Sequence, residues 1–272
     1  MITQLEDTVS LFQEVHRMRV IGSSAAMRRV EREALLAARS SAHVLIAGER
    51  GVGKGVVARF IHERSDRAPH GFAIINCEGL PDLLFESELF GHARNSFPGA
   101  YRNKSGLLNA VPGGTILIDE VGALSEGMQA LLLRFFETGQ YLPVGGDSIQ
   151  TAPNVRVIAS TTADLGVRVA AGSFLGALHR RLATVSLTVP PLRERRDDIP
   201  SLVDHFVRQF VGRSVPFQVA APKIAPEISS AVRDALARAE WPGNVGELKH
   251  AVLQQLLVAA SGTRIKPVSQ SI

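Results

Sequence analysis

The stretch GERGVGKG, residues 48–55, constrains the fold more than any other part of this 272-residue chain. It follows a short apolar run, AHVLIAG (42–48), and precedes GKGVVARFIHERS (53–65), in which apolar residues recur at helical spacing. A glycine-rich turn between a buried strand and a helix lets backbone N–H groups surround phosphate oxygens, and the helix N-terminus favours the same negative charge. The sequence therefore predicts a phosphate-binding loop, with an ordinary turn as the alternative. Its residues are Gly48, Glu49, Arg50, Gly51, Val52, Gly53, Lys54 and Gly55.

Further apolar runs alternate with helical patterns in the first two thirds of the chain. The strand candidates are FAIINC (72–77), GTILIDE (114–120) and VRVIAST (155–161), and MQALLLRFFETG (128–139) reads as a helix that ends at a glycine. Strands separated by helices indicate a parallel sheet covered by helices on both faces. We therefore expect an α/β fold.

The strand pattern stops after VPPLRERRDDIP (189–200), and three helical stretches follow. They are SLVDHFVRQFV, EISSAVRDALARA and NVGELKHAVLQQLLVAA. We expect four parts: an N-terminal helix or linker (1–18), an α/β nucleotide-binding domain (19–195), a small helical domain (196–262) and a tail (263–272).

Composition excludes several functional classes. The net charge of +4, from 30 basic and 26 acidic side chains, is too small and too dispersed to indicate nucleic-acid binding. The single cysteine, Cys77, excludes an internal disulfide, fits a reducing compartment and is predicted to be a small buried residue rather than a nucleophile. No apolar run approaches the ~18 residues that would span a bilayer. With no signal-peptide pattern in the first twenty residues, we expect a cytoplasmic protein.

A pair of acidic residues lies about 65 residues beyond the phosphate-binding loop. The stretch GGTILIDEVG ends an apolar strand in Asp119 and Glu120. Asp119 would hold Mg²⁺ through water, Glu120 would polarise the attacking water, and Lys54 would reach the β and γ phosphates of a nucleotide. The alternative is that the acidic pair only makes a strand end soluble. Gly55 departs from the general loop pattern, in which Ser or Thr offers a hydroxyl to Mg²⁺.

From Arg19 to Ala260 the chain resembles the AAA+ domain of bacterial sigma-54-dependent transcription activators, the enhancer-binding proteins. The matching stretches keep the family's order and spacing: VIGSSAAM, VLIAGERGVGKG, IHERSDRA, INCEGLPDLLFESELFGH, GGTILIDEVG, LPVGG, NVRVIASTT, VPPLRERRDDIP and WPGNVGEL. The resemblance implies an AAA+ P-loop NTPase with a C-terminal helical lid, using ATP and Mg²⁺. It also implies a ring of subunits whose ATP hydrolysis drives a surface loop against sigma-54 to open promoter DNA.

The resemblance assigns roles to individual residues. Asn76 matches the residue that links Glu120 to the nucleotide state, and Thr161 matches the polar group beside the γ phosphate. Thr162 stands where asparagine is usual, and Ile21 is expected at the nucleotide. The glycine at position 55 is tolerated, because the family commonly has glutamate there.

The family's partner-contacting loop lies within ELFGHARNSFPGAYRNKSG (88–106). The family motif is Gly-Ala-Phe-Thr-Gly-Ala, and the same positions here are Asn95, Ser96, Phe97, Pro98, Gly99 and Ala100. Pro98 replaces the threonine thought to engage the sigma factor and removes a hydroxyl and a backbone donor. Asn95 replaces a hinge glycine, which should narrow the loop's freedom. Phe97 resembles the exposed aromatic of this loop, with packing beneath its own loop as the alternative.

Two arginine positions of the family are lost. GSFLGALHRRL resembles the segment that supplies two arginines to the neighbouring subunit's ATP, and Leu175 occupies the first of these positions. Only Arg181 matches the second, and a solvated helix face that includes Arg180 is the alternative. Gly246 stands where the lid's nucleotide-sensing arginine is usual. Because arginines facing the γ phosphate can contribute ~10³-fold or more in rate, binding of Mg·ATP is better supported than turnover.

Two functions are therefore open. The first is an ATP-hydrolysing ring, of identical or paralogous AAA+ subunits, that remodels sigma-54 RNA polymerase through a contact weakened or altered by the loop changes. The second is a catalytically impaired, nucleotide-binding protein that scaffolds or inhibits such a ring, and a AAA+ machine with another client is a third. No helix-turn-helix pattern follows the last helical stretch, so we expect no direct DNA binding by this chain and no membrane contact.

Overall fold

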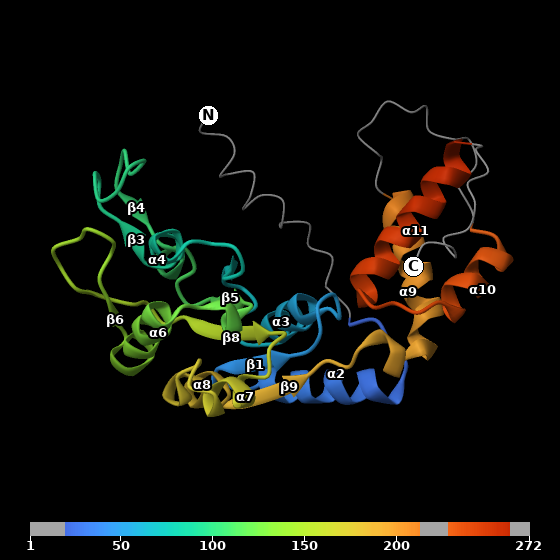
Figure 1. Ribbon diagram of the computed structural model, residues 1–272, viewed down its shortest axis with the longest axis horizontal. Helices are drawn as coiled ribbons and strands as arrows, with labels where there is room; N and C mark the ends of the chain where they lie inside the picture. The colour runs from blue at the N-terminus through green and yellow to red at the C-terminus, as the bar shows by residue number, and fades with distance from the viewer. Residues whose placement is uncertain (1–19, 213–227, 262–272) are drawn as a thin grey trace.

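The computed structural model describes residues 20–212 and 228–261 of the chain (Figure 1). A five-stranded sheet has the order β2-β5-β8-β1-β9, and all of its pairings are parallel. The strands are β1 (Val44–Ala47), β2 (Phe72–Asn76), β5 (Thr115–Asp119), β8 (Arg156–Thr161) and β9 (Val185–Thr188). The predicted α/β class and the four predicted strands are confirmed. The sequence did not predict β9, because only Leu187 of this edge strand is buried and no continuous apolar run marks it.

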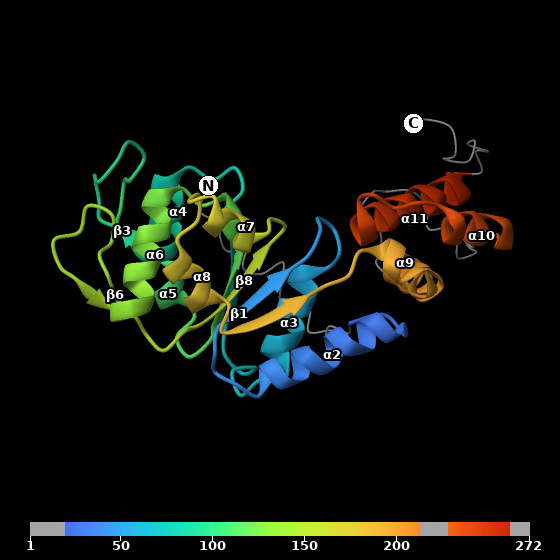
Figure 2. The ribbon, with the colours of Figure 1, turned by 60° about the horizontal axis from the view of Figure 1, so that its bottom comes forward.

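Helices cover both faces of the sheet (Figure 2). On one face lie α2 (Ala25–Ala38) and α3 (Lys54–Glu63), and on the other lie α4 (Asp82–Phe90), α6 (Glu126–Thr138) and α8 (Gly176–Leu182). The strand side chains alternate between the two cores: Val44 and Ile46 pack towards α2 and α3, whereas Leu45 packs towards the opposite helices. The short helices α5 (Leu107–Ala110) and α7 (Leu165–Ala170) complete this layer. Cys77 is buried as predicted, and burial, with the negative charges of Asp119 and Glu120, raises the pKa of its thiol to about 12.

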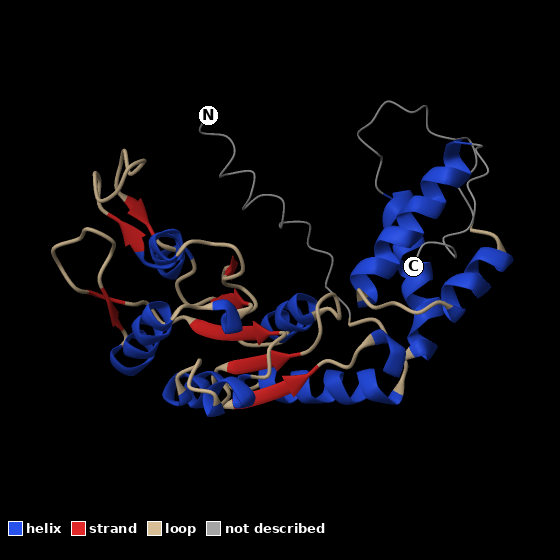
Figure 3. Ribbon diagram, in the orientation of Figure 1, coloured by secondary structure: helices blue, strands red, loops and turns tan. Residues whose placement is uncertain are grey.

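The helical lid is formed by α9 (Ile199–Gly212), α10 (Ser230–Arg238) and α11 (Asn244–Ser261). These helices lie beside the sheet domain and contain no strand between them in the described residues (Figure 3). The lid has its own core, in which Phe206, Trp241 and Leu248 are buried. Leu192, four residues before the expected boundary at 196, is buried in the same core. The segments expected as an N-terminal helix or linker (1–18) and as a tail (263–272) lie outside the described residues. Among the described helices, none combines the length and apolarity needed to cross a membrane.

Two hairpins project from the end of the sheet domain that is far from the lid (Figure 1). One pairs β3 (Gly91–His92) with β4 (Lys104–Ser105), and the other pairs β6 (Gln140–Tyr141) with β7 (Gln150–Thr151). A bridge between His92 and Val144 joins them. The tips also touch, since a Cβ on Gly145 would lie 2.4 Å from Ser96 Cβ. The loop of residues 95–100, for which the family resemblance predicts a partner contact, is therefore supported by the β6–β7 hairpin.

Candidate nucleotide site

The predicted site residues meet at the carboxyl edge of the sheet. The glycine-rich loop follows β1, Asp119 and Glu120 follow the apolar part of β5, and Thr161 ends β8. Parallel strands point the same way, so the residues that follow them gather at one edge, where open α/β sheets bind ligands. The strand register agrees, since Ala47 pairs with Thr161 and Asn76 pairs with Asp119.

The loop of residues 48–53 has the backbone that a phosphate site needs. Gly51 and Gly53 have φ angles of 77° and 105°, in the left-handed region that favours glycine. Gly53 is the N-cap of α3, and no atom lies within 4 Å of the place where its Cβ would be. The N-terminal end of α3 thus faces open space, which suits an anion.

Lys54 is the first residue of α3, directly after this loop, and only 7% of its surface is exposed. Its Nζ donates to the carbonyl oxygens of Gly48 at 2.9 Å and of Glu49 at 3.4 Å, and it forms an ion pair with Glu120 Oε1 at 2.9 Å. A buried ammonium group needs such acceptors or an anionic ligand. The phosphate-binding lysine and the acidic residue predicted for hydrolysis are therefore in direct contact.

Glu120 is held in a strained backbone conformation by its neighbours. Its φ and ψ are 58° and 49°, a left-handed conformation that costs a non-glycine residue on the order of 1 kcal/mol or more. Its Oε2 accepts hydrogen bonds from the backbone N–H and the hydroxyl of Thr162, both at 2.9 Å. Burial alone would raise the pKa of Glu120, but the hydrogen bonds from Lys54 and Thr162, together with the charge of Lys54, bring that pKa below its ordinary value.

Thr162 is a site residue that the sequence reasoning did not select. The only signal in the sequence is its place directly after the strand tip, where it departs from the asparagine that is usual in the family. Thr161, the predicted residue, is buried, and its hydroxyl donates to Ala163 O at 3.1 Å and accepts from the Ala163 N–H at 3.0 Å. Of these two threonines, it is Thr162 whose side chain bonds to the acidic pair.

Asp119 offers a carboxylate suited to Mg²⁺. The fully buried Ser160 hydroxyl donates to its Oδ1, which fixes the carboxylate at the edge of the sheet. The described residues contain no group of three or more acidic, histidine or cysteine side chains that could enclose a metal. A nucleotide-bound Mg²⁺ needs only one or two protein carboxylates, since phosphate and water oxygens complete its shell. The residues present therefore fit that ion.

Two further predicted residues, Asn76 and Ile21, make their observed side-chain contacts outside the loop and the acidic pair. Asn76 Oδ1 accepts the Glu78 N–H at 2.8 Å, so the structure shows no hydrogen bond between Asn76 and Glu120 among the described contacts. Ile21 packs against the hydrophobic core of the lid. Asn76 lies at the carboxyl edge of the sheet, where it pairs with Asp119.

The side chains of Glu49 and Arg50 point away from the interior of the loop. Arg193 donates to both carboxylate oxygens of Glu49, at 2.9 and 2.6 Å, and Asn244 Nδ2 donates to Glu49 Oε2 at 3.1 Å. The hydrogen bond from Arg193, followed by that from Asn244, lowers the pKa of Glu49 from 4.5 to about 2. Arg50 forms an exposed ion pair with Glu78 at 3.5 Å. The phosphate contacts predicted for these two residues would thus come from their backbone.

The structure places Arg181 far from its own phosphate-binding loop. It lies near the end of α8, and β9 then begins with Val185, which pairs with Val44 at the amino end of β1. The loop follows the carboxyl end of β1, so Arg181 lies towards the opposite edge of the sheet, with an exposed side chain. Leu175, the N-cap of α8, is 37% exposed and its N–H donates to Gln129 Oε1 at 2.8 Å.

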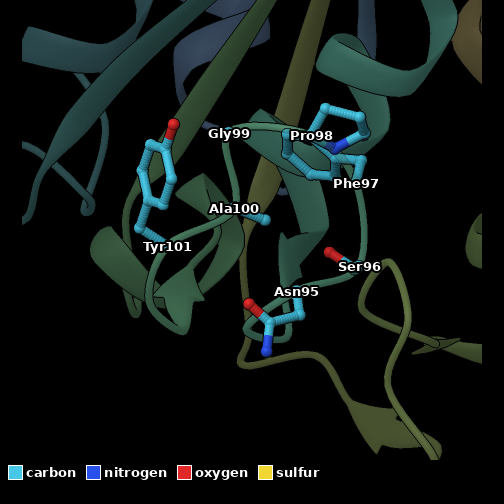
Figure 4. Close-up of a pocket in the computed structure, with 7 residues that line it drawn as sticks. All are labelled: Asn95, Ser96, Phe97, Pro98, Gly99, Ala100 and Tyr101. Carbon is cyan, nitrogen blue, oxygen red and sulfur yellow. The ribbon is translucent and has the colours of Figure 1, made fainter.

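The predicted partner loop has a defined shape (Figure 4). The N–H of Asn95 donates to Ala100 O at 2.7 Å, and Asn95 has a φ of 65°, which asparagine tolerates better than most residues. Phe97 is half-buried, with its ring edge-on to His92 at a centroid distance of 5.0 Å. Tyr101, on the opposite side of the loop, is 85% exposed. The most exposed aromatic residue of this loop is therefore Tyr101, which the sequence reasoning did not single out.

Comparisons with known proteins agree with the fold and the site. The family model of the sigma-54 interaction domain matches residues 20–188, and that of the AAA+ ATPase lid domain matches residues 193–269. The chain is 40% identical over 253 residues to the anaerobic nitric oxide reductase transcription regulator NorR of Escherichia coli K12, covering 93% of this chain and 48% of that protein.

Solved structures give the same assignment. NtrX from Brucella abortus in complex with ADP has a TM-score of 0.79 at 29% identity, covering 97% of this chain and 58% of that one. The same protein in complex with ATP has a TM-score of 0.77 at 30% identity, covering 98% and 58%. The chain thus spans about half the length of the relatives that it matches. Both domain matches, together with the loop, the acidic pair and the lid described above, show that this chain belongs to the sigma-54 interaction domain family of AAA+ ATPases.

Proposed function

We propose that this chain binds Mg·ATP at the loop of residues 48–55 and acts as the AAA+ module of a sigma-54-type transcription regulator in the cytoplasm. The observation that supports this most directly is Lys54, a nearly buried cation bonded both to its own loop and to Glu120. An incoming phosphate would replace Glu120 as the partner of Lys54 and release the carboxylate for its own task.

Each site residue has a defined task in this proposal. The backbone N–H groups of residues 50–55 and the N-terminus of α3 hold the phosphates. Asp119 holds Mg²⁺, which supplies charge neutralisation at the phosphates. Glu120, kept ionised by its low pKa and oriented by Thr162, accepts a hydrogen bond from the attacking water.

Oligomerisation and client contact follow from two other surfaces. Arg181 cannot serve its own loop from the opposite edge of the sheet, so it would act on a nucleotide held by a neighbouring AAA+ subunit, as in a ring. The braced loop of residues 95–100 would contact the sigma-54 form of RNA polymerase. Proline at position 98 and asparagine at position 95 make this a different contact from that of the family motif.

A second candidate function is a nucleotide-binding scaffold or inhibitor of a paralogous ring. The observation that favours it is the loss of two arginine positions, at Leu175 and Gly246. A Cβ on Gly246 would meet only Gly51 Cα, whereas Arg180 comes within 3.5 Å of the Cβ position of Gly176, the neighbour of Leu175. Nucleotide binding would persist in that case, whereas turnover would not.

Phosphate release from Mg·ATP, measured against protein concentration, separates the two functions. We expect turnover that rises more than proportionally with concentration, because each site needs Arg181 of a neighbour. Glu120→Gln is the blank, since it keeps the shape of the side chain but cannot act as a base. Turnover at the level of the blank, in protein that still binds ATP, would contradict the hydrolysing ring and favour the scaffold.

Leu175→Arg is expected to raise turnover in the same assay, by up to about 10³-fold if the new guanidinium reaches the neighbour's γ phosphate. The side chain at this position is partly exposed, so the longer residue has room. Leu175→Met, which has a similar volume and no charge, is the control. Equal turnover in both variants would count against a subunit interface at this surface.

A further inference from the structure

The lid is attached to the outer side of the phosphate-binding loop by a cluster that the family resemblance does not assign. We name it the lid clamp: Glu49 of the loop, Arg193 of the segment between sheet and lid, and Asn244 at the start of α11. We propose that Glu49 is a positioning residue that fixes the lid on the loop through this clamp, rather than a residue whose side chain contacts nucleotide.

The bidentate pair of Glu49 and Arg193 is the charged half of the clamp. Both terminal nitrogens of the Arg193 guanidinium donate to the Glu49 carboxylate, Nη1 at 2.9 Å and Nη2 at 2.6 Å. This fork-to-carboxylate arrangement is directional and stronger than a single-point ion pair. The side chain of Arg193 is 56% exposed and that of Glu49 is 42% exposed, so solvent screens part of the attraction. The charged pair therefore contributes more to the orientation of the lid on the loop than to the strength of their attachment.

Asn244 is the buried half of the clamp. It has no exposed surface, and its φ of 55° places it in the left-handed region that asparagine tolerates. Its Oδ1 accepts the Leu192 N–H at 2.8 Å, and its Nδ2 donates to Glu49 Oε2 at 3.1 Å and to Arg50 O at 3.0 Å. One amide group thus joins the loop, the segment between the domains and the lid.

Backbone contact brings the loop and the lid even closer. A Cβ on Gly51 would lie 2.3 Å from Gly243 O, and the Gly246 N–H donates to Gly51 O at 3.2 Å. No side chain fits between the loop and the lid backbone at this point. The carbonyl groups of residues 50 and 51 are therefore occupied by the lid.

A functional coupling follows, and this step rests on the proposed function. Phosphate would order the loop from the inside, and the lid clamp orders it from the outside. Each event then lowers the conformational cost of the other, and such coupling is reciprocal. The chain would link nucleotide binding to lid position through a loop carboxylate, although no arginine is present at position 246.

Hydrogen–deuterium exchange of the nucleotide-free chain tests the clamp itself. We expect Glu49→Gln and Arg193→Gln each to speed amide exchange in peptides covering residues 241–248 by about threefold or more, with little further gain in the double variant, because both remove the same interaction. Glu78→Gln is the matched control, since it removes the charge partner of Arg50 on the same loop without touching the lid. Exchange in Glu49→Gln equal to wild type would overturn the proposal.

A second variant, and a measurement of ATP binding, distinguish failure of the lid clamp from failure of the proposed function. Asn244→Gly keeps a residue that adopts positive φ but removes the amide group, and we expect about tenfold faster exchange of the same peptides. Wild-type protein that shows an intact clamp but binds no ATP would contradict the proposed function and leave the clamp standing. ATP binding that protects residues 241–248 equally in wild type and Glu49→Gln would contradict the coupling.

Discussion

Lys54→Ala is expected to weaken ATP binding by about 100-fold or more. The Lys54 ammonium group bonds to the loop carbonyl oxygens of Gly48 and Glu49, and hydrogen bonds to charged groups contribute ~1.5–3 kcal/mol each. Removing it also leaves Glu120 facing the phosphates without its ion-pair partner, so repulsion adds to the loss. Equilibrium titration with a fluorescent ATP analogue measures the dissociation constant directly.

Two controls make this result decisive. Lys54→Met keeps most of the buried volume and should lose binding to the same extent, which separates loss of charge from loss of packing. Arg29→Ala removes an exposed cation of α2 that pairs only with Glu33 in the same helix, and binding should be unchanged. Affinity retained in both Lys54 variants, with melting temperatures near that of wild type, would contradict the assignment of the phosphate-binding loop.

Gly246→Arg is expected to restore a missing part of the site. A Cβ at this position meets only Gly51 Cα, at 3.6 Å, which is ordinary van der Waals contact, so the new side chain would start directly above the phosphate-binding loop. An arginine that faces the γ phosphate can raise turnover by about 10³-fold, and its charge should also tighten ATP binding. Single-turnover hydrolysis and ATP affinity are the two measurements.

Gly246→Ala is the matched control for this substitution. Glycine within a helix is less favourable than alanine by ~1 kcal/mol, so both variants should melt at a higher temperature than wild type. Only the arginine variant should gain affinity for ATP. A gain shared by both variants would assign the effect to a stiffer α11 and not to the new charge.

The sequence predicted the central fold because local pattern and long-range structure agree there. The four predicted strands are short apolar runs, which favour burial on both faces. Three of them, β1, β5 and β8, are buried in this way, whereas β2 lies at the edge of the sheet and buries only Ile75. The predicted loop and acidic pair then meet without further information, since both follow parallel strands at the same edge.

Long-range side-chain contacts could not be predicted in the same way. Glu49 and Asn244 are 195 residues apart, and nothing in the local pattern of either stretch specifies that they meet. The role of Thr162 depends on the left-handed backbone of Glu120, which turns the carboxylate towards β8. Spacing along the chain also does not reveal that Tyr101 is exposed while Phe97 packs against His92.

The bridge between the two hairpins has a mechanical consequence. Helix α4 ends at Phe90 and leads directly into β3, while α6 ends at Thr138 and is separated from β6 by one residue, Gly139. Because His92 and Val144 join the hairpins, a shift of either helix is transmitted to both of them. We therefore expect the two hairpins to move together, so that a small rotation of α4 or α6 produces a larger displacement at the tip that carries Phe97 and Tyr101.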